Sequence, residues 1–243
     1  MNYETLAIER RGAVATIWMD RPAVFNAFNE QLIAELAAAC VELDADASVR
    51  VVVLAGRGKH FSAGADLNWM RRASDSTEAE NLADSRKFAA MLRTLSEMSK
   101  PTIARVQGAA LGGGTGLTAA CDMAIAADDA SFATSEVKFG IIPAVISPYV
   151  LRAIGPRHAL RYFQSAERFG AVEAKAMGLV GEVVTVDELD AAVDRLVQAL
   201  LACGPQAQLA AKQLIAALAG RPIDDARSEE HTFELQSRQY LVC

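Results

Sequence analysis

Residues 3–19 contain two short runs in which apolar and polar positions alternate, with Arg10-Arg11-Gly12 between them. Alternation with a period of two is typical of strands that bury one face, and a glycine between two such runs favours a tight turn. The pattern therefore predicts a β-hairpin. Asp20-Arg21-Pro22 follows and ends the second strand.

The pattern then changes to helical spacing, and after it strands and helices take turns along the chain. A predicted amphipathic helix begins after Asn29, a residue suited to cap it, with apolar positions at Leu32, Leu36, Cys40 and Leu43. We expect strands at 49–56, Thr102–Val106 and Met123–Ala127, with a helix over 88–98 that Lys100-Pro101 terminates. This order predicts βαβ crossovers and an α/β core.

The most informative stretch is 106–117, where a strand runs into Gly112-Gly113-Gly114 and then into an apolar helix. Glycines allow a turn that has no room for side chains, and they leave peptide N–H groups free at a helix N-terminus. Such a turn can hold an anion, or an oxygen that becomes one during a reaction. A tight turn without any chemistry has the same pattern, so other parts of the chain must decide.

The C-terminal part contains two helical patterns within 187–218, which Gly204-Pro205 separates. We divide the chain into a core at 1–185, a helical region at 186–226 and a tail at 227–243. The wording of the tail resembles translated sequencing-adapter read-through. We therefore expect this tail to be foreign to the natural protein.

Composition narrows the classes of function. The chain has 243 residues, 52% apolar and 22% charged, which fits one main globular domain. Its net charge of −6 argues against nucleic acid as a partner. The four cysteines form no CxxC pair, so we expect neither a metal site nor disulfides, and a reducing cytoplasm fits best. No leader and no apolar run of about 20 residues is evident, so no membrane partner is expected.

Five segments of the chain, in this order, have the form of motifs: Asp20-Arg21-Pro22 with Asn26-Ala27, Phe61-Ser62-Ala63-Gly64-Ala65-Asp66-Leu67, Lys100-Pro101 leading to Gly108-Ala109-Ala110-Leu111-Gly112-Gly113-Gly114, Cys121-Asp122-Met123, and Ser135-Glu136 with Gly140-Ile141-Ile142-Pro143. Read together, they resemble those of the crotonase family, the enoyl-CoA hydratases and isomerases. The resemblance covers roughly residues 5–220.

The resemblance implies a spiral of ββα units with a helical C-terminal region, and chemistry that stabilises a thioester enolate. It places the two oxyanion-hole N–H groups at Ala65 and Gly113. Two preorganised donors in a dry site lower the barrier for such an anion by several kcal/mol. We expect small residues at both positions because the substrate approaches the backbone itself.

The implied substrate carries coenzyme A, so no separate cofactor is expected. Lys59 and Arg21 lie beside the motif loops, and we nominate them for the phosphates of coenzyme A. Ala63, Asp66 and Leu67 match positions where the loop backbone of the family meets the adenine and pantetheine groups. An ordinary solvated surface charge is the alternative for both basic residues.

Glu136 is the expected acid and base, because family hydratases place a proton-transferring glutamate at this point. We expect Phe139 and Ile141-Ile142 to bury its carboxylate and to raise its pKa. Many hydratases carry a second glutamate in the helix after the glycine turn, where this chain has Gly116. Two reactions remain open: hydration of a 2-enoyl thioester with Glu136 as the base, and isomerisation of a 3-enoyl thioester.

The segment 143–155 resembles the bacterial branch associated with 3-methylglutaconyl-CoA hydration in leucine breakdown, which favours hydration. A substrate with its own carboxylate would be repelled by a second glutamate, so Gly116 would relieve that contact. Arg152 and Lys138 are candidate partners for the substrate carboxylate. A non-catalytic or RNA-binding scaffold is the alternative class. The family also implies a homotrimer or a dimer of trimers.

Overall fold

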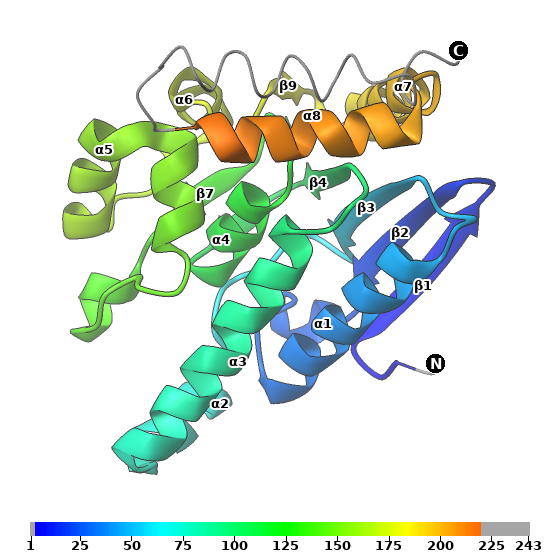
Figure 1. Ribbon diagram of the computed structural model, residues 1–243. Coiled ribbons are helices and arrows are strands. Elements are labelled where there is room, and N and C mark those ends of the chain that lie inside the picture. The colour runs from blue at the N-terminus through cyan, green and yellow to red at the C-terminus, as the bar shows by residue number, and fades with distance from the viewer. Residues whose placement is uncertain (1–2, 220–243) are drawn as a thin grey trace.

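A six-stranded sheet runs through the computed structural model, which describes residues 3–219 (Figure 1). Its strand order is β1-β2-β3-β4-β6-β9. The first two strands pair antiparallel and the remaining neighbours pair in parallel, which confirms the predicted hairpin and the parallel core. The strands are β1 (Leu6–Arg11), β2 (Val14–Met19), β3 (Val51–Gly56), β4 (Thr102–Val106), β6 (Met123–Ala127) and β9 (Glu182–Val184).

A smaller sheet of three strands has the order β5-β7-β8 and carries the glycine turn at the end of its first strand. Strand β5 pairs in parallel with β7, and β7 pairs antiparallel with β8. A strand leading into the glycine turn was expected but not as an element separate from Thr102–Val106, and β7 and β8 were not predicted, because each is only two or three residues long. Their bounds are β5 (Ala109–Leu111), β7 (Ser131–Ala133) and β8 (Phe169–Gly170).

Helices cover both faces of the large sheet. In Figure 1, α1 (Glu30–Ala45), α3 (Glu78–Ser96) and α4 (Gly113–Ala120) lie on one side, and α7 (Leu189–Leu201) lies on the other. Strand β3 shows how the sequence serves both: Val52 and Leu54 belong to the core under α1, α3 and α4, whereas Val51 and Val53 pack with α7. All six residues of β3 are buried, as expected for a central parallel strand.

Local capping explains where the two long helices begin. The side chain of Asn29 accepts a hydrogen bond of 2.9 Å from Leu32 N–H, which confirms the predicted cap of α1. Thr77 and Glu80 form a capping box that starts α3 ten residues before the apolar stripe seen in the sequence.

Three helices were not predicted: α2 (Leu67–Asp75), α5 (Ser147–Ser165) and α6 (Ala171–Met177). Helix α5 contains Gly155-Pro156, a pair that reads as a break in the sequence. The structure has a kink at this pair, where Gly155 takes a non-helical conformation with a φ of 72° that glycine tolerates. The three short 3₁₀ helices are η1 (Pro22–Val24), η2 (Glu136–Phe139) and η3 (Val186–Glu188).

The two C-terminal helices differ in how they attach. Leu189, Val193 and Val197 of α7 are buried against the large sheet, so this helix belongs to the core. Helix α8 (Pro205–Leu218) buries no residue completely, and an ion pair of 2.9 Å joins its Lys212 to Asp122. Over residues 3–219, no helix has both the length and the apolar character needed to cross a membrane. The predicted foreign tail at 227–243 lies outside the described residues.

Candidate active site

Two backbone turns from distant parts of the chain lie against each other at the end of β5. Ser62 N–H donates to the Ala109 carbonyl at 3.0 Å, and Leu111 N–H donates to the Ser62 carbonyl at 2.9 Å. A Cβ atom on Gly64 would lie 3.1 Å from the carbonyl oxygen of Leu111, and a Cβ atom on Gly112 would lie 3.9 Å from Gly64 Cα. The loop around Gly64 and the glycine turn are therefore neighbours.

The peptide N–H of Ala65 points away from the strand-like pairing of this loop. Phe28 N–H donates to the Gly64 carbonyl at 2.7 Å, and Asp66 N–H donates to the Phe28 carbonyl at 2.9 Å. In a parallel bridge the residue between these two groups directs its own N–H to the other side. Within residues 3–219 the N–H of Ala65 has no hydrogen-bond partner, and the residue is exposed.

Gly113 begins helix α4, so its N–H has no acceptor within the helix. The preceding Gly112 has a φ of 50° and donates to the Ala133 carbonyl at 2.7 Å, whereas Gly113 N–H has no partner in the described part of the chain. The glycine itself has a reason that the sequence did not indicate. A Cβ atom at 113 would lie 2.7 Å from Phe28 and 2.9 Å from Phe88, so packing alone requires glycine here.

Glu136 lies over the glycine turn at the start of η2. Its Oε1 atom would be 3.3 Å from a Cβ atom on Gly112, and its Oε2 atom is buried without a hydrogen-bond partner among the described residues. Burial raises the pKa of the Glu136 carboxyl. The residues expected to bury this carboxylate were wrong. Phe139 is 59% exposed, and Ile141 and Ile142 are 55% and 72% exposed, so these side chains do not cover Glu136.

These groups make one chemical arrangement. The two unpaired N–H groups follow directly after Gly64 and Gly112, whose backbones are in contact, and the carboxyl of Glu136 lies over the same Gly112. Free peptide donors can stabilise a developing oxyanion, and a buried carboxyl with a raised pKa can both take and give a proton near neutral pH.

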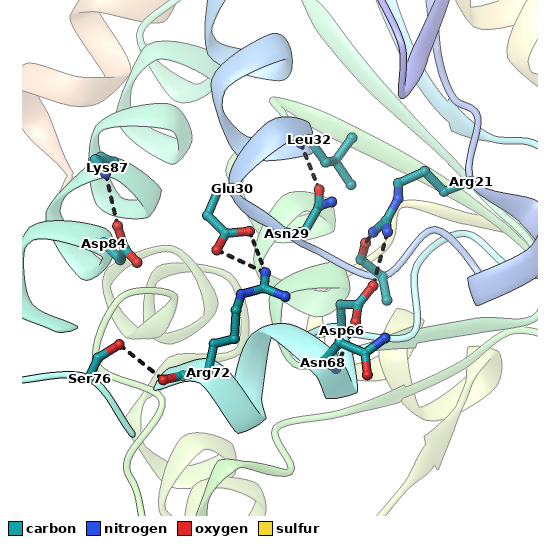
Figure 2. A network of polar contacts seen from close by, with 11 residues as sticks. Arg21, Asn29, Glu30, Leu32, Asp66, Asn68, Arg72, Ser76, Asp84 and Lys87 are labelled. Carbon is teal, nitrogen blue, oxygen red and sulfur yellow. Dashed lines mark hydrogen bonds and ion pairs between the residues drawn. The ribbon is translucent and has the colours of Figure 1, made fainter. Parts of the chain in front are cut away.

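Asp66 positions the Ala65 loop. As Figure 2 shows, its carboxylate accepts hydrogen bonds from Asn68 N–H and from Arg21 Nη2, both at 2.9 Å, and so caps α2. Burial by itself would raise the pKa of Asp66, but the hydrogen bonds from Arg21 and Asn68 outweigh it and lower the pKa. Arg21 also donates to the Ala27 carbonyl, and its side chain is 17% exposed. Its charge is therefore already paired within the chain, and the phosphate contact expected of it stays a prediction.

The other three expected binding residues lie near this loop. Lys59 is exposed and forms no ion pair within residues 3–219. Leu67 is 67% exposed at the start of α2. Ala63 is half-buried, and its N–H already donates to the Phe25 carbonyl at 2.9 Å.

Gly116, at the position where many hydratases carry a second glutamate, is packed against a side chain. A Cβ atom there would lie 2.4 Å from Cγ2 of Ile146, so this side chain fills the position. Arg152, a candidate partner for a substrate carboxylate, donates to Ser96 Oγ at 3.3 Å and lines a cavity of about 820 Å³ beside α8, away from Glu136. Lys138 is exposed on η2.

His60 supports the glycine turn through a hydrogen bond. Its Nδ1 atom accepts a hydrogen bond of 3.0 Å from Ala109 N–H at the start of β5. Its ring also meets Phe25 edge to face, with centroids 5.0 Å apart. Burial, followed by the positive charge of Lys59, lowers the pKa of His60. The one sequence signal was its place in the motif loop, directly before Phe61.

The chain is similar to known proteins over most of its length. The family Enoyl-CoA hydratase/isomerase matches residues 9–240. A probable enoyl-CoA hydratase of Mycobacterium bovis is 40% identical over 190 residues, which cover 78% of this chain and 72% of the relative. A crotonyl-CoA hydratase of Syntrophomonas wolfei is 34% identical over 210 residues, covering 84% and 78%.

The fold has close counterparts among solved structures. The crystal structure of an enoyl-CoA hydratase from Shewanella pealeana superposes with a TM-score of 0.94 at 41% identity, covering 98% of this chain and 89% of that one. The fold class predicted from the sequence, a crotonase-like α/β fold, is confirmed. The chain belongs to the enoyl-CoA hydratase/isomerase family, the crotonases.

Proposed function

We propose that the protein is an enoyl-CoA hydratase, which adds water across the C2=C3 bond of an acyl-CoA thioester. The observation that carries this proposal is the carboxyl of Glu136 over the glycine turn: its buried Oε2 atom and the N–H of Gly113 both have no hydrogen-bond partner among the described residues 3–219. The names of the relatives in Mycobacterium bovis and Syntrophomonas wolfei support the same reaction.

In this mechanism the N–H groups of Ala65 and Gly113 bind the thioester oxygen. Glu136 takes a proton from water while the water oxygen forms a bond to C3, and the electron pair of the double bond moves toward the thioester oxygen. The resulting enolate is stabilised by the two N–H groups. Glu136 then returns its proton to C2 and becomes a carboxylate again, so the proton balance closes within one turnover.

The coenzyme A part of the substrate would lie along the loop that carries Ala63 and Leu67, with Lys59 near its phosphates. The support is that Lys59 is exposed and free of ion pairs in the described chain, whereas Arg21 is held by Asp66. No separate cofactor takes part in the proposed reaction, because coenzyme A belongs to the substrate.

For the acyl group we propose 3-methylglutaconyl-CoA or a related branched or carboxylated enoyl-CoA from leucine or isoprenoid-acid breakdown. This proposal rests on the resemblance of 143–155 to that branch of the family. With Ile146 over Gly116, the distal carboxylate of the substrate has to lie elsewhere in the site.

A Δ3,Δ2-enoyl-CoA isomerase is the second candidate, and the contact of Gly116 with Ile146 favours it. Moving a proton from C2 to C4 needs one base. Glu136 can be that base, and the position of a second carboxyl at Gly116 is occupied by the side chain of Ile146. Incubation with 2-enoyl and 3-enoyl thioesters separates the candidates. A 3-hydroxyacyl product from crotonyl-CoA or 3-methylglutaconyl-CoA supports hydration, whereas conversion of a 3-enoyl to a 2-enoyl thioester without hydration overturns it.

We further propose that the natural protein assembles as a homotrimer or a dimer of trimers in the cytoplasm. The support for assembly is α8, which buries no residue completely and leaves Ile215 68% exposed. The support for the location is that Cys40 and Cys121 are free and buried, as in a reducing compartment. Light scattering coupled to gel filtration tests the mass, and cell fractionation tests the location.

A further inference from the structure

Gly112, which directly precedes α4, and Gly116 in its first turn are covered by different side chains. Gly116 N–H donates to the Gly112 carbonyl at 3.0 Å, so the two residues are one helical turn apart. Glu136 Oε1 lies over Gly112, and Ile146 Cγ2 lies over Gly116. Because one turn rises about 5.4 Å, the groups that cover the two glycines lie at the same end of α4.

The contact with Gly116 explains why residue 146 is an isoleucine, whereas its position at the start of α5 does not. Ile146 is the N-cap of α5, and its side chain makes no capping hydrogen bond. Isoleucine is among the least favourable residues at that position. The side chain is 2% exposed, and Ile146 with Gly116 behaves as a matched pair, a large residue packed on a position without a side chain.

Among residues 3–219, no charged side chain contributes to the raised pKa of Glu136, which is caused by burial. The Oε2 atom has no hydrogen-bond partner in this part of the chain. On the neighbouring elements, Asp66 is paired with Arg21, and Lys138 of η2 is exposed to solvent. None of these described groups replaces a second carboxylate.

We propose that Ile146 is a positioning and specificity-determining residue, which fills the place of a second carboxylate and keeps water out of the space beside Glu136. The proposal rests on the proposed function, and it deepens it: all proton exchange with the substrate passes through Glu136. Water can then reach Glu136 from the substrate side alone. Such a site works on thioesters that place their reacting carbon next to one base.

A double-mutant cycle tests the matched pair without any assay of activity. Gly116→Ala brings a Cβ atom onto Ile146 and should lower the melting temperature clearly, whereas the same change in an Ile146→Ala background should cost much less. Ala119→Gly, which lies in α4 like Gly116, is the reference substitution, and its effect on the melting temperature should be the same with Ile146 and with Ile146→Ala. Gly155→Ala is unsuitable as a reference because the φ of Gly155 is positive. Additive effects for Gly116→Ala would overturn the pairing.

The pH profile of turnover tests the effect on Glu136. Hydration needs the carboxylate form, so activity rises with pH through the Glu136 pKa. Ile146→Ala admits water and should move this acidic limb down by about one pH unit, whereas Ile146→Val should leave it in place. An unmoved limb in Ile146→Ala overturns the proposal. If the wild-type protein hydrates no thioester, the proposed function fails by itself, and the isomerase reaction supplies the pH profile for the same comparison.

Discussion

Asp66 and Arg21 form an ion pair of 2.9 Å that joins the start of α2 to the segment after β2. Both side chains are mostly buried, at 11% and 17% exposure, and Asp66 also accepts from Asn68 N–H. The residue before Asp66 is Ala65, whose N–H has no hydrogen-bond partner within residues 3–219. The ion pair therefore fixes the position of the Ala65 N–H group, although neither side chain of the pair forms a hydrogen bond with that group.

Replacing Arg21 by Met should destabilise the protein by about 1–3 kcal/mol, because a mostly buried carboxylate loses its partner. It should also lower kcat by moving the Ala65 peptide. The double variant Arg21→Met/Asp66→Asn should recover stability, since asparagine is neutral and still caps a helix. Urea unfolding and steady-state kinetics measure both effects.

Arg72→Met is the matched control, because the Arg72–Glu30 pair shown in Figure 2 has side chains that are 59% and 45% exposed. It should change the free energy of unfolding by no more than about 0.5 kcal/mol. Equal losses in Arg21→Met and Arg72→Met would contradict the role given to the buried pair.

Replacing Glu136 by Gln should lower turnover of every substrate by a factor of at least about 10² while the fold is retained. Its effect on stability should depend on pH. The folded state raises the pKa of Glu136, so this group stabilises the protein below its unfolded pKa of about 4.3 and loses that contribution as the pH rises through the folded pKa. Calorimetry should find Glu136→Gln more stable than wild type at pH 7, with the difference vanishing near pH 4. Retained turnover would refute the assignment.

The parts of the fold that were predicted depend on short-range patterns. Asn29 caps α1 and Thr102–Val106 forms β4 as expected, because a cap and a β-branched run act within a few residues. Helix α5 was missed as an element, but the break that Gly155-Pro156 indicates by local rules is present as a kink, because the φ and ψ of Gly155 are not helical.

Sequence motifs indicate which backbone positions belong to the candidate site. They do not indicate which side chains from distant segments pack around those positions. The motif loops placed Ala65 and Gly113, whereas the contact of Gly113 with Phe28 and Phe88 joins three separate segments. The apolar run at Ile141-Ile142 suggested a wall around Glu136 but is exposed, since periodicity does not tell which way a loop faces.

His60 should make the stability of the protein depend on pH around neutrality. Its pKa is lowered in the folded state, so its contribution is present above the unfolded pKa of about 6.5 and is lost as the pH falls through the folded pKa. Protonation of Nδ1 also breaks the bond to Ala109 N–H. His60→Asn can keep an acceptor there and should remove this pH dependence, whereas His60→Ala should cost about 1–3 kcal/mol. The free energy of unfolding measured at pH 8 and at pH 5.5 checks this. If it changes by the same amount between the two pH values in wild type and in His60→Asn, the prediction is contradicted.

Lys59 should contribute to binding of the coenzyme A phosphates and not to the chemical step. Its side chain is exposed, so the contact is screened by water and worth at most about 1 kcal/mol, or a factor of about 5 in KM. Lys59→Gln should therefore raise KM with kcat unchanged, and added salt should shrink the difference from wild type. Lys175→Gln, an exposed lysine of α6, is the control with an unchanged KM. A fall in kcat at constant KM would instead make Lys59 part of the arrangement around Ala65, because a phosphate contact acts equally on the ground state and the transition state.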